Sequence, residues 1–220
     1  MVETRSGTAG AELSSREGID TMSWIGTADE SGDAAVAAAY EKDRATLGYV
    51  ANYTKVFAHR PAVLAAWQGL NTSIKASMDP RRYELATLAA ALRLRSSYCS
   101  LAHGAVLADR HVGPDALPGI VADPRTAGLT DVEAAVMTLA DKVAAGAASM
   151  TPEDLQELKD LGLDDAAVLD VVLAAAARCF FSSVLDAVGA EPDAAYRALD
   201  PSVRDALTIG RRIESADATG

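Results

Sequence analysis

Aromatic residues, cysteines and basic side chains are all scarce in this chain of 220 residues. Only 5% of the residues are aromatic, whereas 50% are hydrophobic and alanine-rich stretches recur along the chain. Alanine has the highest helix propensity and sheet sandwiches favour aromatic and β-branched residues, so this composition predicts an all-α fold. A chain of this length buries about 70% of its unfolded surface, which supports one core without disulfide or metal staples.

The shortage of basic residues bears on the partners of the protein. Thirty-one acidic residues against 20 basic ones give a formal net charge of −11. Phosphate backbones and anionic membranes attract positively charged proteins, so we expect neither nucleic acid nor a membrane as a partner. The most apolar run, 166–177, is interrupted by Asp170 and closed by Arg178, which makes it too short and too charged to cross a bilayer.

The two cysteines, Cys99 and Cys179, lie far apart in a chain without a secretory pattern, so a disulfide framework is not expected. The first twenty residues carry several charges and no apolar core, unlike a signal peptide. We therefore expect a cytoplasmic protein whose residues 1–21 form a flexible tail.

Helical periodicity and capping signals predict about seven to nine helices. Residues 22–190 are expected to form one helical domain, and residues 191–220 a C-terminal extension that packs back on the body or on a neighbouring subunit. Residues 113–129 hold three prolines and three glycines and are expected to be a connection with a short helical turn. The expected helices span residues 34–47, 53–70 with a break at Pro61, 80–95, 97–112, 131–143, 152–161, 165–179 and, weakly, 201–209.

The residues suited to chemistry are concentrated in residues 96–103. Cys99 and His103 are four apart, so on a helix their side chains share one face and come within reach of a hydrogen bond, directly or through water. A helix N-terminus and a neighbouring imidazole both stabilise a thiolate. Glu84, one helix earlier, could orient His103 or accept its proton, so the three residues match a nucleophile, a base and an orienting group.

The order Glu84, eleven residues, Ser96, two residues, Cys99, three residues, His103 resembles a pattern of the alkylhydroperoxidase D-like (AhpD-like) branch of the carboxymuconolactone decarboxylase family. That pattern is Glu, eleven residues, Cys-x-x-Cys, three residues, His. The flanking segments 59–61, 129–135, 160–163 and 184–189 are similar as well, and 207–211 resembles the ending of the peroxidase-related members. The resemblance implies an AhpD-like multi-helix domain, self-association as a dimer or hexamer, and no cofactor.

The sequence departs from this pattern at Ser96, which stands where the family has its first cysteine. Serine cannot form the intramolecular disulfide of the dithiol members. A sulfenic acid at Cys99 would therefore need an external thiol, another subunit or Cys179 to resolve it. Tyr98 stands where some members carry histidine and supplies a phenol donor. We take Ser96 and Tyr98 as polar neighbours of the site.

The leading hypothesis is a thiol-dependent, peroxidase-like oxidoreductase that reduces hydrogen peroxide or organic hydroperoxides. Cys99 would be the nucleophile, His103 the base, Glu84 the proton relay, and an external thiol or redox protein the reductant. The alternative is a purely structural role, in which Cys99 is a small buried side chain and His103 packs in the core with its hydrogen bonds satisfied.

Two other classes of function stay open. In a lyase acting on a small lactone acid, Glu84 and His103 would transfer protons, and a substrate carboxylate would need one of the nearby cations Arg81, Arg82, Arg93 and Arg95. A non-catalytic oligomeric protein is the third possibility, motivated by the serine at position 96. No metal site is expected, because Glu84, Cys99 and His103 have no second histidine or cysteine pair beside them.

Overall fold

The computed structural model describes residues 22–215, so the expected tail at 1–21 lies outside the described residues. The described chain is 70% helical and contains no strand, which confirms the all-α prediction. Eight helices have seven or more residues and two are shorter. Their bounds are α1 (Ala34–Leu47), α2 (Asn52–Phe57), α3 (Pro61–Ser77), α4 (Pro80–Arg93), α5 (Ser97–Leu107), α6 (Leu117–Ala122), α7 (Asp131–Gly146), α8 (Pro152–Asp160), α9 (Asp165–Ala187) and α10 (Pro201–Leu207).

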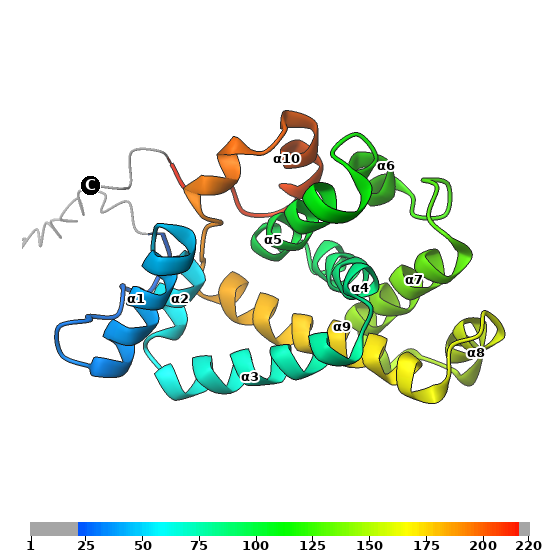
Figure 1. The fold of residues 1–220 in the computed structure, drawn as a ribbon, viewed down its shortest axis with the longest axis horizontal. Coiled ribbons are helices and arrows are strands. Elements are labelled where there is room, and N and C mark those ends of the chain that lie inside the picture. Colours follow the sequence, from blue (N-terminus) through cyan, green and yellow to red (C-terminus); the bar gives the residue numbers. More distant parts are fainter. Residues whose placement is uncertain (1–21, 216–220) are drawn as a thin grey trace, which may run out of the picture.

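Helix α4 forms the centre of the domain and packs against α5, α7 and α9 (Figure 1). It starts where the sequence predicts, because the Asp79 side chain accepts a hydrogen bond from the backbone N–H of Arg82 and Pro80 occupies the first helical position. Every residue from Tyr83 to Ala91 is buried. A helix that is covered on all sides is apolar all round, so the one charged residue in this stretch, Glu84, needs a partner inside the protein.

Helix α9 is the longest helix of the described chain and is capped by Asp164. By length and composition alone it is apolar enough to cross a membrane. In the fold it packs against α3, α4, α5, α7 and α8, and Val171, Ala175 and Leu185 are buried in the core. Figure 1 shows α3 and α9 running alongside each other. Within residues 22–215, α9 is therefore a core helix of the domain.

The C-terminal segment packs back on α5 of the same chain. Ser100 Oγ donates to the Leu207 carbonyl at 2.6 Å, and the Gly210 N–H donates to Ser97 Oγ at 2.7 Å. A Cβ at Gly210 would lie 2.1 Å from the Arg95 carbonyl oxygen, so this close approach requires glycine. The segment thereby closes one side of α5.

Several helix ends differ from the sequence prediction, and α9 runs on to Ala187, beyond the predicted end at residue 179. The helix that begins at Pro61 runs on to Ser77, beyond the predicted end at residue 70, because Ile74 extends its buried face. The helix that carries Cys99 continues after Leu107 as a π-helix, Ala108–Val112, and ends before Gly113 as expected. A single π turn lengthens the hydrogen-bonded ring and shifts the following side chains around the axis, which sequence periodicity does not reveal.

Candidate active site

The structure brings the three predicted catalytic residues together on α4 and α5. Glu84, Cys99 and His103 are 4%, 1% and 9% exposed. His103 Nδ1 lies 2.6 Å from Glu84 Oε2, and Lys75 Nζ lies 3.5 Å from Glu84 Oε1. Glu84 is past the first turn of α4, so its partners are these side chains and not the helix N-terminus.

His103 is neutral at pH 7. Burial, helped by the charge of Arg178 and opposed by Glu84, lowers the pKa of His103 to about 4. Burial disfavours an ionised Glu84, but the hydrogen bond from His103 and the nearby positive charge hold the pKa of this carboxyl below its usual value. A carboxylate only accepts hydrogen bonds, so Nδ1 carries the imidazole proton and donates it to Glu84. Nε2 is left as the basic nitrogen.

Arg178 of α9 is the residue that the sequence reading missed. Its Nη1 donates to Cys99 Sγ at 3.5 Å, and its guanidinium carbon lies 5.4 Å from the ring centre of Phe181. Burial alone would lower the pKa of this guanidinium, but the neighbouring Cys99 and Tyr83 raise it, so Arg178 stays charged. A cation at this distance stabilises a thiolate.

A direct hydrogen bond between Cys99 and His103, which their spacing allows, does not form among the described residues. Cys99 interacts with Arg178, and His103 with Glu84. Cys99 and His103 nevertheless line the same cavity, with a volume of about 320 Å³. A substrate or a water molecule in this cavity would connect the thiol to the imidazole.

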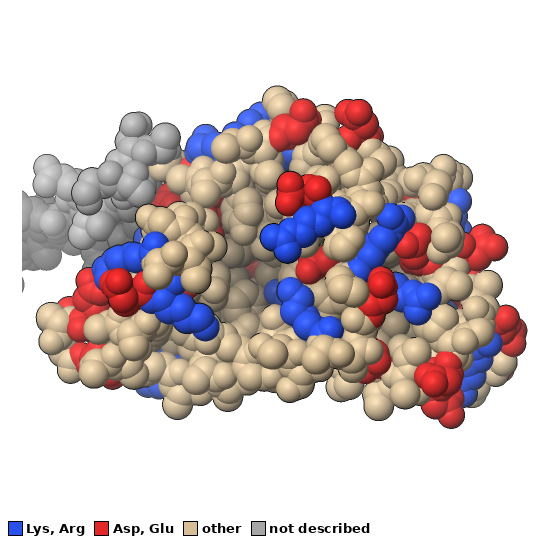
Figure 2. All heavy atoms as spheres, in the orientation of Figure 1, with Lys and Arg blue, Asp and Glu red and all other residues tan. Residues whose placement is uncertain are grey.

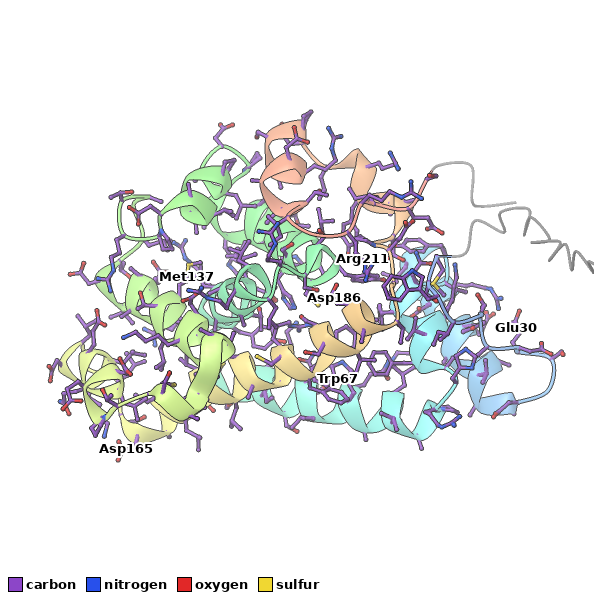
Figure 3. The ribbon with its side chains drawn as sticks, turned by 180° about the vertical axis from the view of Figure 1, so that it is seen from behind. Glu30, Trp67, Met137, Asp165, Asp186 and Arg211 are labelled. Carbon is purple, nitrogen blue, oxygen red and sulfur yellow. The ribbon has the colours of Figure 1, made fainter. Side chains whose placement is uncertain are left out.

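The cavity lies between α1, α2, α3, α5 and α9, and Figure 2 shows a hollow between the α1–α2 part and the body of the molecule. The ring of Trp67 stacks on Phe181 with centres 4.8 Å apart, and Figure 3 shows Trp67 between α3 and α9. Flat apolar walls with a few polar groups are typical of small-molecule sites. The aromatic residues that line the cavity are Tyr53, Trp67, Tyr98, Phe181 and Tyr196.

Of the two predicted polar neighbours, Tyr98 lines the cavity and Ser96 does not. Tyr98 lines the cavity, but its hydroxyl donates to Asp193 Oδ2 at 2.6 Å and accepts from the Tyr53 N–H at 3.0 Å. Ser96 is fully buried and is not a cavity residue. It lies beside Asp186, where burial raises the pKa of the carboxyl and the Ser96 hydroxyl opposes that shift. The site therefore includes Tyr98 as a wall and does not include Ser96.

The cations expected for a lyase do not line this cavity. Arg81 pairs with Glu133, and Arg93 pairs with Asp141. Arg95 donates to the Ile209 carbonyl, and Arg82 does not reach the cavity either. Those candidates for a carboxylate anchor are wrong for this site. A lone arginine in the apolar run of α9 was the signal that points to Arg178 instead, because a buried cation needs a partner.

Cys179 follows Arg178 on α9 but does not line the cavity. It is half-buried, and burial raises the pKa of its thiol. Among residues 22–215, no group of three or more His, Cys, Asp or Glu side chains could hold a metal ion. The cavity is lined by one thiol, Cys99, and one imidazole, His103, with the guanidinium of Arg178 beside the thiol.

These features define an all-α domain with a single-cysteine site, and comparison with solved structures confirms the AhpD-like resemblance at the level of the fold. A peroxidase-related protein from Ralstonia eutropha JMP134, described as an alkylhydroperoxidase AhpD core, aligns with a TM-score of 0.72 and 18% identity over 80% of this chain and 94% of its own.

Two further structures share the fold. A peroxidase-related protein from Silicibacter sp. TM1040 aligns with a TM-score of 0.68 and 20% identity over 76% of this chain and 88% of its own. A debrominase in complex with 2,3,4-tribromopyrrole aligns with a TM-score of 0.67 and 16% identity over 82% of this chain and 95% of its own. No protein-family model matches the sequence, and a search of curated proteins finds no match.

Proposed function

We propose that the protein is a thiol-dependent oxidoreductase that reduces organic hydroperoxides through Cys99. The observation that carries this proposal is the contact between the Cys99 thiol and the buried Arg178 guanidinium inside an aromatic-lined cavity. A thiol that only fills space does not require a buried cation beside it. The aromatic walls favour an organic hydroperoxide over hydrogen peroxide.

The residues of the cavity support a balanced reaction. His103 Nε2 takes the thiol proton, and the Cys99 thiolate attacks the outer peroxide oxygen. The O–O bond breaks, and the alkoxide leaves as an alcohol with the proton that His103 returns. Cys99 becomes a sulfenic acid. While His103 holds the proton, the Glu84 carboxylate 2.6 Å from Nδ1 stabilises the imidazolium.

Because this chain supplies no second thiol at the cavity, resolution of the sulfenic acid requires two thiols from outside it. Ser96 has no thiol and Cys179 does not line the cavity. The first external thiol forms a mixed disulfide with Cys99 and releases water, and the second releases Cys99 as a thiol. We therefore propose a small thiol or a redox protein as the reductant, acting in a reducing, cytoplasmic compartment.

The test is the rate of sulfenic acid formation at Cys99, followed by mass spectrometry with cumene hydroperoxide and with hydrogen peroxide. Cys99→Ser is the blank, because Cys179 remains. We expect oxidation faster than that of free cysteine, and faster with cumene hydroperoxide than with hydrogen peroxide. Oxidation no faster than that of free cysteine with either reagent contradicts the proposal.

A second candidate is thiol-dependent removal of halogen from a small aromatic ring. The debrominase whose structure holds tribromopyrrole shares this fold, and the cavity of this chain has aromatic walls around a single thiol. The measurement is bromide release from 2,3,4-tribromopyrrole with dithiothreitol as the reductant. Release that requires Cys99, together with inertness toward hydroperoxides, would favour this function over the first.

We also propose that the chain forms a homo-oligomer, a dimer or a hexamer. Apolar side chains are exposed along the outer faces of α3 and α9, where the chain itself does not cover them. These are Val63, Leu70, Leu169, Leu173 and Phe180. Light scattering coupled to size-exclusion chromatography measures the mass directly, and a monomer at micromolar concentration would contradict this expectation.

A further inference from the structure

Arg178 carries a buried charge that no carboxylate of residues 22–215 neutralises. The residue is 4% exposed, and its neighbours are Cys99, Tyr83 and aromatic rings. Glu84, the buried acid of the site, is already engaged by His103 and Lys75. Arg178 Nε is buried and has no hydrogen-bond partner among the described residues. A buried donor without a partner is unfavourable, so this N–H has unused capacity for an acceptor.

The cavity that Arg178 lines contains no acidic side chain. Its lining includes the cations Lys42 and Arg178 and the imidazole of His103, whereas the whole chain has a net charge of −11. Figure 2 shows basic side chains on both sides of the hollow on this face. A locally positive cavity in an acidic protein concentrates small anions, because low-dielectric walls focus the field.

The shape of the cavity restricts which anion fits. Trp67 and Phe181 are stacked and present flat apolar surface, while Gln68, Asn71 and Thr72 add neutral hydrogen-bonding groups. A volume of about 320 Å³ accommodates a single substituted ring. Flat walls favour a planar ring, and a guanidinium fork favours a planar carboxylate.

We propose that the cavity binds a small aromatic carboxylate, whose carboxylate pairs with the guanidinium of Arg178 while its ring packs against Trp67 and Phe181. Arg178 Nη1 keeps its contact with Cys99 Sγ, so one guanidinium holds both the nucleophile and the ligand. This inference rests on the cavity being the reaction site proposed above, and it names the class of substrate as an aromatic acid that carries the reducible group.

The test is calorimetric titration of the full chain with benzoate, with benzyl alcohol and with acetate at pH 7 and constant ionic strength. Benzyl alcohol has the ring without the charge, and acetate has the charge without the ring. We expect benzoate to bind at least about tenfold more tightly than either. Equal binding of benzoate and benzyl alcohol, or no benzoate binding, overturns the inference without any variant being needed.

Variants then locate the anion. Arg178→Met should weaken benzoate binding about 10- to 100-fold, and Arg178→Lys, which keeps the charge but loses the fork, should weaken it less. Arg93→Met removes an exposed cation that pairs with Asp141 outside the cavity, so it should leave affinity unchanged within about twofold. Far-UV circular dichroism verifies that each variant is folded. Unchanged benzoate affinity in a folded Arg178→Met protein overturns the inference.

Cys99→Ser separates this inference from the proposed function. The serine variant has no thiolate to share the guanidinium, so it should bind benzoate at least as tightly as the wild type. If it does, and the wild type fails to reduce hydroperoxides, the ligand class stands and the redox proposal fails. If the wild type reduces hydroperoxides but binds benzoate no better than benzyl alcohol, the ligand class alone fails.

Discussion

The two sides of α5 both carry buried polar groups, but they differ in how far these groups are satisfied by hydrogen bonds. On the side that faces the C-terminal segment, Ser97 accepts from Gly210 N and Ser100 donates to the Leu207 carbonyl. On the side that faces the cavity, the Cys99 thiol meets a guanidinium and the His103 imidazole has one free nitrogen. The first side is saturated with hydrogen bonds, and the second is left incomplete.

This difference separates stability from chemistry within one helix. Saturated buried hydrogen bonds fix the position of α5 without offering anything to a ligand. Incomplete groups in a low-dielectric cavity cost stability and can act on a substrate. Variants on the two sides should therefore affect different measurements.

The largest expected effect is the pH dependence of stability that arises from His103. The pKa of this imidazole is about 4 in the folded protein against about 6.5 unfolded, so the unfolded chain binds an extra proton between these values. Stability is full above about pH 6.5 and falls, by up to about 3 kcal/mol, as the pH drops toward 4. Urea unfolding of the wild type and of His103→Gln at several pH values measures this change in the free energy of unfolding. The variant should lose this slope, and parallel curves for the two proteins would show that His103 is not its source.

Gly210→Ala should destabilise the protein by disturbing the packing of the C-terminal segment on the hydrogen-bonded side of α5. The added Cβ meets the backbone carbonyl of Arg95, which has no side-chain freedom to move away, so we expect a loss of about 2–3 kcal/mol. Gly69→Ala in α3 is the matched control, because nothing lies within 4 Å of its Cβ and alanine favours the helix. Thermal unfolding measures both. Equal melting temperatures for the two variants would mean that the C-terminal segment does not pack as described.

Arg178→Met should damage the incomplete side. Without the guanidinium, negative charge on Cys99 Sγ loses its neighbouring cation, and alkylation by iodoacetamide at pH 7 should slow about tenfold. Replacement of a buried charge by an apolar side chain of similar length need not destabilise the fold. Mass spectrometry distinguishes the peptides of Cys99 and Cys179, and the latter serves as an internal reference. An unchanged rate at Cys99 would remove Arg178 from the mechanism.

Ser100→Ala should have the smallest effect, a loss of about 1 kcal/mol from one buried hydrogen bond to the Leu207 carbonyl. Oxidation of Cys99 should continue at the wild-type rate, although the two residues are adjacent. Ser73→Ala removes an exposed hydroxyl from α3 and should change stability by less than about 0.5 kcal/mol. A loss of Cys99 reactivity in Ser100→Ala would mean that the two sides of α5 are not independent.

Much of the fold could be predicted from local signals. Asp33, Asp79, Thr130 and Asp164 cap helices that begin where the sequence indicates. Capping is a contact between residues two or three apart, so it is visible in the sequence. The extension of α3 to Ser77 was missed because burial of Ile74 depends on a distant part of the chain.

The candidate site could be predicted in part. Spacing placed Cys99 and His103 on one face of α5, and Glu84, one helix earlier, was added as the group that orients the imidazole. The direct hydrogen bond between them does not form, because the partner of Cys99 comes from α9, 79 residues further along the chain. Ser96 and Tyr98 looked equivalent as polar neighbours, yet only Tyr98 reaches the cavity.

The sequence by itself determined an all-α chain, the order of its helices, and the one segment where a thiol, an imidazole and a carboxylate come into register. Those properties follow from propensity, capping and spacing, which act over a few residues. Only the tertiary structure decided that Arg178 of α9 is the partner of Cys99 and that Ser96 faces Asp186. These contacts depend on how α4, α5 and α9 pack, and burial in that packing leaves His103 neutral and Arg178 charged beside the thiol.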